Sequence, residues 1–281
     1  MSVAAQYIPA AFSLSAVAVW GSSDFLGGMG ARRVNAFLFT TIVHVSGMVA
    51  MGSLALVTHA QFPDRTGLLW SFAAGAVGGL SLAFFYRALS RGNMGLIAPV
   101  AAVLSAAIPT IVTALALGFP GYRHLFGFIL AGIGVWLISR TEGDSGHPEG
   151  LGMAVIAGVG FAGFYLCIHQ AGNASALWTA ACSRAASLVV TAVFVFFGRQ
   201  VHAVAAPVAA MAILAGILDV SGSAFFIRAA QIGRLDNAVV LSSLYPAVTV
   251  LLARFFLHEH FSRGRTIGMV AALAAVPMIA G

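Results

Sequence analysis

The sequence predicts an all-α membrane protein with ten transmembrane helices in two inverted five-helix repeats. The 281 residues are 60% hydrophobic and 8% charged, with a mean hydropathy of +0.98, whereas a water-soluble domain of this length needs far more surface charge. Apolar residues fall in runs of roughly 20, long enough to cross a bilayer as helices. The stretch AFFYRALSRG at 83–92 returns as AFFIRAAQIG at 224–233, which indicates an internal repeat. We call the shift from position 83 to position 224 the repeat offset.

Five apolar spans are expected in the first half. The first has no basic start and runs into WGSSDFLGG without a small-residue cleavage site, so it is a helix of the protein and not a signal peptide. The fourth carries Pro109 near its middle, where proline removes a backbone hydrogen bond and kinks a helix. The fifth is short. The spans cover 8–29, 34–57, 67–90, 94–118 and 124–140.

The second half repeats this order. Pro246 stands in its fourth span, as Pro109 does in the first half, and its last span is again short. The apolar residues run continuously and do not alternate with polar ones, which argues against lipid-facing β-strands. The spans cover 150–170, 174–198, 207–230, 236–257 and 264–280.

The polar stretch SRTEGDSGHPEG at 139–150 is too short to fold by itself and separates the halves. The expected domains are therefore a first repeat at 1–140, a linker at 141–149 and a second repeat at 150–281. Because each half makes an odd number of crossings, the second half must enter the membrane from the opposite side. Inverted repeats are recurrent in secondary transporters, which bind their ligand near the midplane between the halves. A transporter working by alternating access is favoured over a purely structural duplication.

Three stretches resemble the drug/metabolite transporter superfamily, and within it the EamA family. They are WGSSDFLGG at 20–28, YRALSRG at 86–92 and SSLYPAVTVLLARFFLHEHFSRGRTIGMV at 242–270. The last resembles the family pattern most specifically, with Pro246, Glu259 and Gly268 in order. The first half departs from it, because LGFPGYRHLFGF has no glutamate at the place of Glu259. The resemblance implies ten helices in two inverted repeats that move small metabolites, often exporting amino acids or amphipathic drugs.

Charged residues inside the apolar spans are expensive to bury and usually face a cavity or a partner. Arg184, near the centre of its span, is expected either to bind a substrate carboxylate or to form an internal salt bridge with Asp24 or Asp219. Asp219 is a candidate proton carrier or the static partner of Arg184. Asp24 lies nearer a helix end, which favours a cap or interfacial role over transport chemistry.

Histidines and aromatic residues complete the candidate site. The histidines can relay protons, although a hydrogen bond to a nearby carbonyl is the more frequent role of a lone histidine. Aromatic rings can stack on an aromatic or cationic ligand. The expected substrate-binding residues are Trp20, His44, Tyr86, Tyr165, Arg184, Asp219 and Tyr245, and those expected in coupling or gating are Asp24, His169, Pro109 and Pro246.

Other classes of function find little support. The basic residues are all arginines scattered through short loops, which does not suit nucleic-acid binding. HEH at 258–260 has no third metal ligand after it, and no G-x-S-x-G or HExxH motif is present. We expect no enzyme activity, no metal and no cofactor. A multidrug or cationic-compound exporter, a lipid-handling protein and a membrane-embedded enzyme are the alternatives.

The expected partners are a small-molecule substrate and the lipid bilayer of the inner (cytoplasmic) membrane. A monomer is compatible with the sequence, because the Gly75-x-x-x-Gly79 motif is expected to serve packing within the chain rather than a dimer. Orientation is open. Arginines are more frequent after odd-numbered spans, which places both termini outside by the positive-inside rule, whereas the family resemblance implies cytoplasmic termini.

Overall fold

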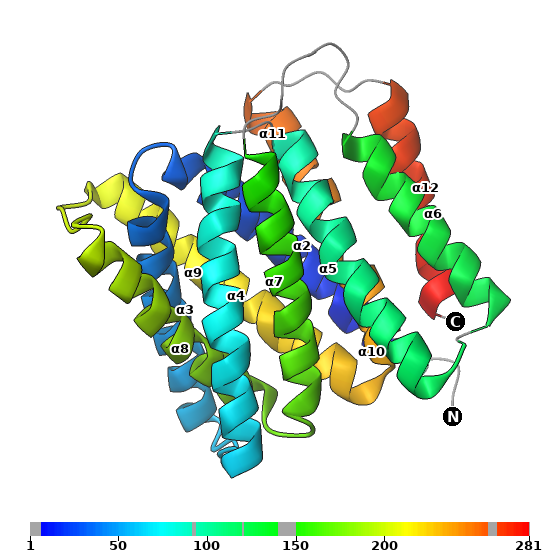
Figure 1. Cartoon of the computed structure of the whole chain (residues 1–281), viewed down its shortest axis with the longest axis horizontal. Coiled ribbons are helices and arrows are strands. Elements are labelled where there is room, and N and C mark those ends of the chain that lie inside the picture. Colours follow the sequence, from blue (N-terminus) through cyan, green and yellow to red (C-terminus); the bar gives the residue numbers. More distant parts are fainter. Residues whose placement is uncertain (1–6, 92–93, 120, 140–149, 258–262, 281) are drawn as a thin grey trace.

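The computed structural model describes residues 7–91, 94–119, 121–139, 150–257 and 263–280. These residues form α-helices joined by short loops, with no strand among them. The predicted linker at 141–149 and Glu259 lie outside the described residues. In chain order (Figure 1) the helices are α2 (Ile8–Ala31), α3 (Ala36–Val57), α4 (Arg65–Arg91), α5 (Met94–Leu117), α6 (Tyr122–Ser139), α7 (Leu151–Gln170), α8 (Ala176–Phe197), α9 (Ala206–Ile232), α10 (Leu235–Ser242), α11 (Tyr245–Leu257) and α12 (Arg263–Ala280).

Helix lengths recur between the two halves of the chain. Helices α3 and α8 have 22 residues each, α4 and α9 have 27 each, and α6 and α12 have 18 each. The members of each pair start at positions 36 and 176, 65 and 206, and 122 and 263, which is a nearly constant shift. The repeat offset first seen between two short stretches therefore extends over most of both halves.

The loops after α3 and α8 also match. His59 has a φ of 50° and Arg199 a φ of 51°, and these are the non-glycine residues with positive φ in the described part of the chain. In each loop the amide of the next residue donates to the carbonyl five residues earlier, Ala60 to Ala55 and Gln200 to Val195, each at 2.9 Å. A left-handed conformation costs a non-glycine residue roughly 1–2 kcal/mol, so its recurrence at the equivalent place in the second half reflects a shared path of the chain.

The helices of one half pack against helices of the other in a reciprocal pattern. Helix α2 packs on α9, and α4 packs on α7, which is the same relation with the halves exchanged. Likewise α4 contacts α8 as α3 contacts α9, and α5 contacts α7 as α10 and α11 contact α2. Helices α6 and α12 pack on each other at one edge of the bundle (Figure 1). Other relations are unequal; α2 contacts α4 more extensively than α7 contacts α9, and α5 contacts α6 more extensively than α10 contacts α12.

Glycines set the close crossings between the halves. A methyl group on Gly75 in α4 would overlap the carbonyl oxygen of Ser183 in α8. At the equivalent crossing, a methyl group on Gly216 in α9 would overlap the carbonyl oxygen of Val43 in α3. The prediction that Gly75 and Gly79 serve packing within the chain is confirmed, because Gly79 also lies against α8.

The two matched prolines act differently. Pro246 follows a break at residues 243–244 that separates α10 from α11, whereas Pro109 lies within the continuous helix α5. The ring of a helical proline clashes with the carbonyl four residues earlier, which for Pro246 is that of Ser242, the last residue of α10. The hydroxyl of Ser243 also donates to the carbonyl oxygen of Val240 at 2.7 Å, a side-chain bond that competes with the hydrogen bonds of the helix backbone.

Six stretches of the described chain are long and apolar enough to cross a membrane. Many of their side chains face outward although they are apolar; Phe197 is 79% exposed and Val57 is 76% exposed. Such a surface suits lipid and not water. The six are Ala36–Val57, Arg65–Arg91, Leu151–Gln170, Ala176–Phe197, Ala206–Ile232 and Leu235–Phe256, the last spanning the break between α10 and α11.

Candidate functional site

A pocket lies between helices of both halves, with about 460 Å³ of empty space including the part that is open to solvent. Helices α2 and α4 supply its walls from the first half, and α7, α8, α9 and α11 supply them from the second. Two acidic side chains and one basic side chain face it among aromatic rings. The lining residues are Trp20, Asp24, Gly78, Leu82, Phe161, Phe164, Tyr165, Arg184, Asp219, Ser223 and Tyr245.

Arg184 and Asp219 form a buried ion pair in this wall. The distance from Arg184 Nη2 to Asp219 Oδ2 is 2.9 Å, and the two side chains are 5% and 7% exposed. The same nitrogen donates a hydrogen bond of 2.5 Å to Ser223 Oγ. Ser223 lies one turn after Asp219 on α9, and its hydroxyl donates to the Asp219 carbonyl oxygen at 3.1 Å. The internal salt bridge that the sequence left as one alternative for Arg184 is therefore formed, with Asp219 and not Asp24.

Trp20 packs beside the ion pair of Arg184 and Asp219. Its Nε1 donates to the Asp219 carbonyl oxygen at 3.0 Å, a contact between the first and the second half of the chain. The indole lies directly on α9 because Gly222 has no side chain there; a Cβ on Gly222 would approach the ring to 2.6 Å. A polar tip bonded to backbone and an apolar body facing the pocket are typical of a buried tryptophan.

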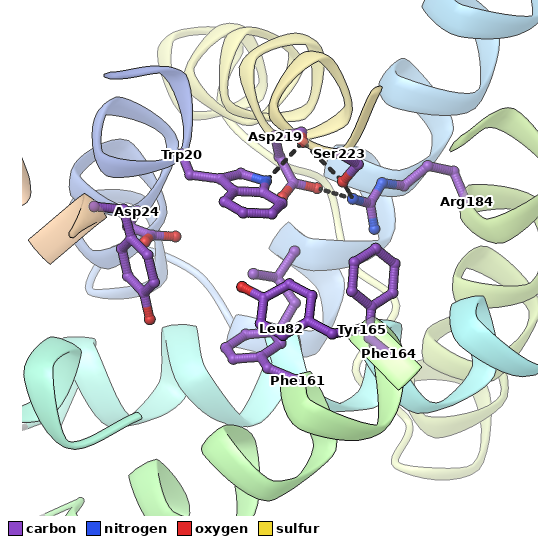
Figure 2. A pocket seen from close by; sticks show the side chains of 11 residues that line it. Trp20, Asp24, Leu82, Phe161, Phe164, Tyr165, Arg184, Asp219 and Ser223 are labelled. Carbon is purple, nitrogen blue, oxygen red and sulfur yellow. Dashed lines mark hydrogen bonds and ion pairs between the residues drawn. The ribbon is translucent and has the colours of Figure 1, made fainter. Parts of the chain in front are cut away.

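Asp24 faces the same pocket from α2 and is 6% exposed. Within the part of the chain that the structure describes, its carboxylate takes part in no hydrogen bond and no ion pair. Figure 2 shows Trp20 between Asp24 and the pair formed by Arg184 and Asp219. The sequence favoured a cap or interfacial role for Asp24, but α2 continues to Ala31 and leaves Asp24 inside the bundle.

Aromatic rings form most of the remaining wall. Trp20 lies 6.1 Å from Tyr165 and 5.8 Å from Phe226, measured between ring centroids. Phe226, which is fully buried and is not a lining residue, lies 4.6 Å from Tyr165. The hydroxyl of Tyr245 is buried without a hydrogen-bond partner among the described residues. The pocket therefore offers π-faces and one phenol group that is free to bond a ligand.

The other residues singled out in the sequence lie outside this wall. Tyr86 is fully buried, and its hydroxyl is 3.0 Å from that of Ser23. His44 is also fully buried, with both ring nitrogens unpartnered in the described structure. His169 is exposed in the last turn of α7, and Pro109 is buried in α5.

The repeat relates most of the lining residues to one another. Eight of the eleven form four pairs separated by the repeat offset: Trp20 with Phe161, Asp24 with Tyr165, Gly78 with Asp219, and Leu82 with Ser223. A ring contact supports this correspondence, because Trp20 packs on Phe226 at 5.8 Å as Phe161 packs on Phe85 at 5.5 Å. The sequence analysis did not name Gly78, Leu82, Phe161 or Phe164 for the site. Applying the repeat offset to Trp20 and Asp219 would have found Phe161 and Gly78.

Comparisons with known proteins address the family and the fold. The model of the EamA-like transporter family matches residues 148–281, which confirms the resemblance seen in the sequence over the second half of the chain. Among solved structures, a crystal structure of a protein that is 18% identical covers 96% of this chain and 95% of its own, with a TM-score of 0.73. At this identity the likeness shows a shared fold. No curated protein matches the chain significantly.

Proposed function

We propose, because residues 148–281 match the model of the EamA-like transporter family, that the chain carries small amphipathic organic solutes across a membrane. Amino acids, including aromatic ones, are among the expected solutes, and the expected direction is export. Transport proceeds by alternating access, either driven by a coupled gradient or facilitative. The family supports transport over catalysis, and the inner (cytoplasmic) membrane is the proposed location.

The structural observation that supports this proposal best is the position of the pocket. It lies between the halves, and four pairs of repeat-equivalent residues line it. A site built from equivalent positions of both halves lies at the axis that relates them. Exchanging the conformations of the halves would then open the same site to the opposite side of the membrane, as alternating access requires.

The proposed topology has ten crossings in two inverted repeats, at 1–140 and 150–281. The recurring helix lengths and the reciprocal packing of α2 on α9 and α4 on α7 support it. In this topology α2, α5, α6 and α12 cross the membrane together with the six stretches that are long and apolar by themselves. The unequal contact of α2 with α4 and of α7 with α9 supports a molecule held in one of two alternate states.

The proposed roles follow from position. Trp20, Tyr165 and Tyr245 form the wall against which the solute stacks, and Arg184 and Asp219 fix the polar end of that wall. His44 and Tyr86 support the wall from behind, since both are fully buried outside it. For gating, the break before Pro246 is a hinge candidate and Pro109 its counterpart, whereas exposed His169 is proposed to act at the entrance.

Reconstitution into liposomes tests the proposal. The full chain should accelerate the efflux or uptake of some members of a panel of radiolabelled amino acids and aromatic amines, measured with and without a pH gradient. Trp20→Ala should reduce this flux at least tenfold, because it removes both a stacking face and the contact with Asp219. Trp70→Ala is the matched control, since Trp70 is 38% exposed and lies outside the pocket. Absence of flux for the whole panel, with the protein folded, would contradict transport of such solutes.

A further inference from the structure

We propose that the solute bound in this pocket carries a positive charge on an aromatic body, as in a small aromatic amine, and that Asp24 is the carboxylate that binds it. The inference rests on the proposed transport function and narrows its small amphipathic solutes to aromatic amines, in place of the amino acids named there. It differs from the expectation drawn from the sequence, in which Arg184 binds a substrate carboxylate.

The first step is the state of Asp24. Its side chain is 6% exposed, faces the pocket and takes part in no hydrogen bond or ion pair with the described residues. The charged form of a buried carboxylate without a partner is disfavoured, so such a group is paired, binds a cationic ligand or takes up a proton. The space that Asp24 faces is the pocket itself, so a cationic solute that enters the pocket would supply the missing partner.

The second step concerns the basic residue of the pocket. The Nη2 atom of Arg184 contacts Asp219 at 2.9 Å and Ser223 at 2.5 Å, so the charge of Arg184 is paired with Asp219, while its Nε has no hydrogen-bond partner among the described residues. Trp20 lies between this group and Asp24 (Figure 2). Of the two acidic lining residues, Asp219 is thus neutralised by Arg184, and Asp24 has no basic partner in the wall. A solute with one positive charge balances it, whereas a zwitterion brings a carboxylate that has no second basic residue in the wall.

The third step concerns the rings around Asp24. Trp20, Tyr165 and Tyr245 line the same pocket and present faces that attract a cation. The unpartnered hydroxyl of Tyr245 can accept a hydrogen bond from an ammonium group. The charge of Asp24 and the aromatic faces around it together fit an aromatic amine.

The repeat explains why the charge lies on one side. At the repeat offset, the counterpart of Asp24 is Tyr165, and the counterpart of Asp219 is Gly78. Neither carboxylate is therefore duplicated by the other half. The ammonium group of the solute therefore has one anionic partner, Asp24, and the equivalent position of the other half supplies the ring of Tyr165.

Matched pairs of compounds test the proposal. Equilibrium binding to the full, detergent-solubilised chain is measured for tryptamine against tryptophan and for phenylethylamine against phenylalanine; each pair differs by one carboxylate. Tryptophol replaces the amine of tryptamine by a neutral hydroxyl. We expect the amines to bind at least tenfold more tightly than both the amino acids and the alcohol. Flux in liposomes should follow the same order.

Asp24→Asn should weaken the binding of tryptamine at least tenfold without lowering the melting temperature, because it removes an unpaired buried charge. Asp64→Asn is the matched control; Asp64 lies outside the pocket and caps α4 through the amide of Gly67 at 2.8 Å, which asparagine can also do. Equal binding of tryptamine to Asp24→Asn would overturn the proposal. The wild-type order of affinities tests it independently of any variant.

The two proposals fail in different ways. If the amino acids or tryptophol bind as tightly as the amines and are transported, the charge assignment is wrong and the transport function stands. If tryptamine binds tightly through Asp24 but no solute crosses the liposome membrane, the charge assignment stands and the transport function is contradicted. If nothing binds, both are overturned.

Discussion

For Arg184, the sequence predicts that a partner is needed but does not identify which residue the partner is. Its place in an apolar span indicates that it needs a partner, and Asp24 and Asp219 both qualify from the sequence. The choice between them depends on the packing of α8 against α9, which brings Asp219 and Ser223 to the same nitrogen. Such a contact across the bundle is not encoded in local spacing. The unpaired state of Asp24 follows from the same choice, and so the sequence could not predict it.

Removing one member of the pair should cost more than removing both. Arg184→Ala leaves the Asp219 carboxylate buried and uncompensated, and we expect a loss of about 3–5 kcal/mol in stability. The double variant Arg184→Met with Asp219→Leu leaves no buried charge and should lose less. Thermal unfolding in detergent, followed by fluorescence, gives the order of melting temperatures. A double variant less stable than Arg184→Ala would show that the pair is stabilising in itself.

At the scale of helices, long apolar runs locate the elements well. The span expected at 67–90 forms α4 at Arg65–Arg91, and the span expected at 34–57 forms α3 at Ala36–Val57. The weaker point is continuity within a helix. Proline predicts a kink in both fourth spans, yet the chain breaks at 243–244 before Pro246 and stays helical around Pro109. Of the two serines before Pro246, Ser243 donates a competing hydrogen bond to the Val240 carbonyl, whereas the hydroxyl of Ser242 has no partner among the described residues, and this difference depends on the surrounding structure.

The crossing of α4 and α8 gives a prediction at this scale. Gly75→Ala places a methyl group against the carbonyl of Ser183 and should force the helices apart, at a cost of about 1–3 kcal/mol. Gly52→Ala in α3 is the matched control, because a Cβ there meets nothing within 4 Å. Its melting temperature in detergent should be unchanged or slightly raised, since alanine favours helix over glycine. Equal melting temperatures for Gly75→Ala and the wild type would contradict the close crossing.

At the scale of the whole molecule, the internal duplication accounts for the loops, the helix crossings and the pocket as well as for the number of helices. One nearly constant offset relates helix ends, left-handed loop residues, glycine crossings and the lining of the pocket. Equivalent positions nevertheless carry different chemistry, such as Asp219 in place of Gly78. The repeated framework therefore positions the site, and the differences between the halves give it charge and specificity.

The inverted relation of the halves makes a prediction that separates it from a parallel duplication. His59 and Arg199 are equivalent, exposed loop residues. In inverted repeats they lie on opposite faces of the membrane, whereas parallel repeats place them on the same face. In a background with Cys167 and Cys182 replaced by alanine, His59→Cys and Arg199→Cys are treated with a membrane-impermeant maleimide in intact cells. We expect one of them to be labelled and the other only after permeabilisation.

The same experiment decides the orientation. His59 follows the second crossing and shares the side of the N-terminus, and Arg199 follows the seventh and lies opposite. Cytoplasmic termini, as the family resemblance implies, predict labelling of Arg199→Cys in intact cells. The distribution of arginines predicts labelling of His59→Cys instead. Labelling of both variants in intact cells, with equal rates before and after permeabilisation, would contradict the inverted repeat and remove the symmetry on which alternating access through this pocket depends.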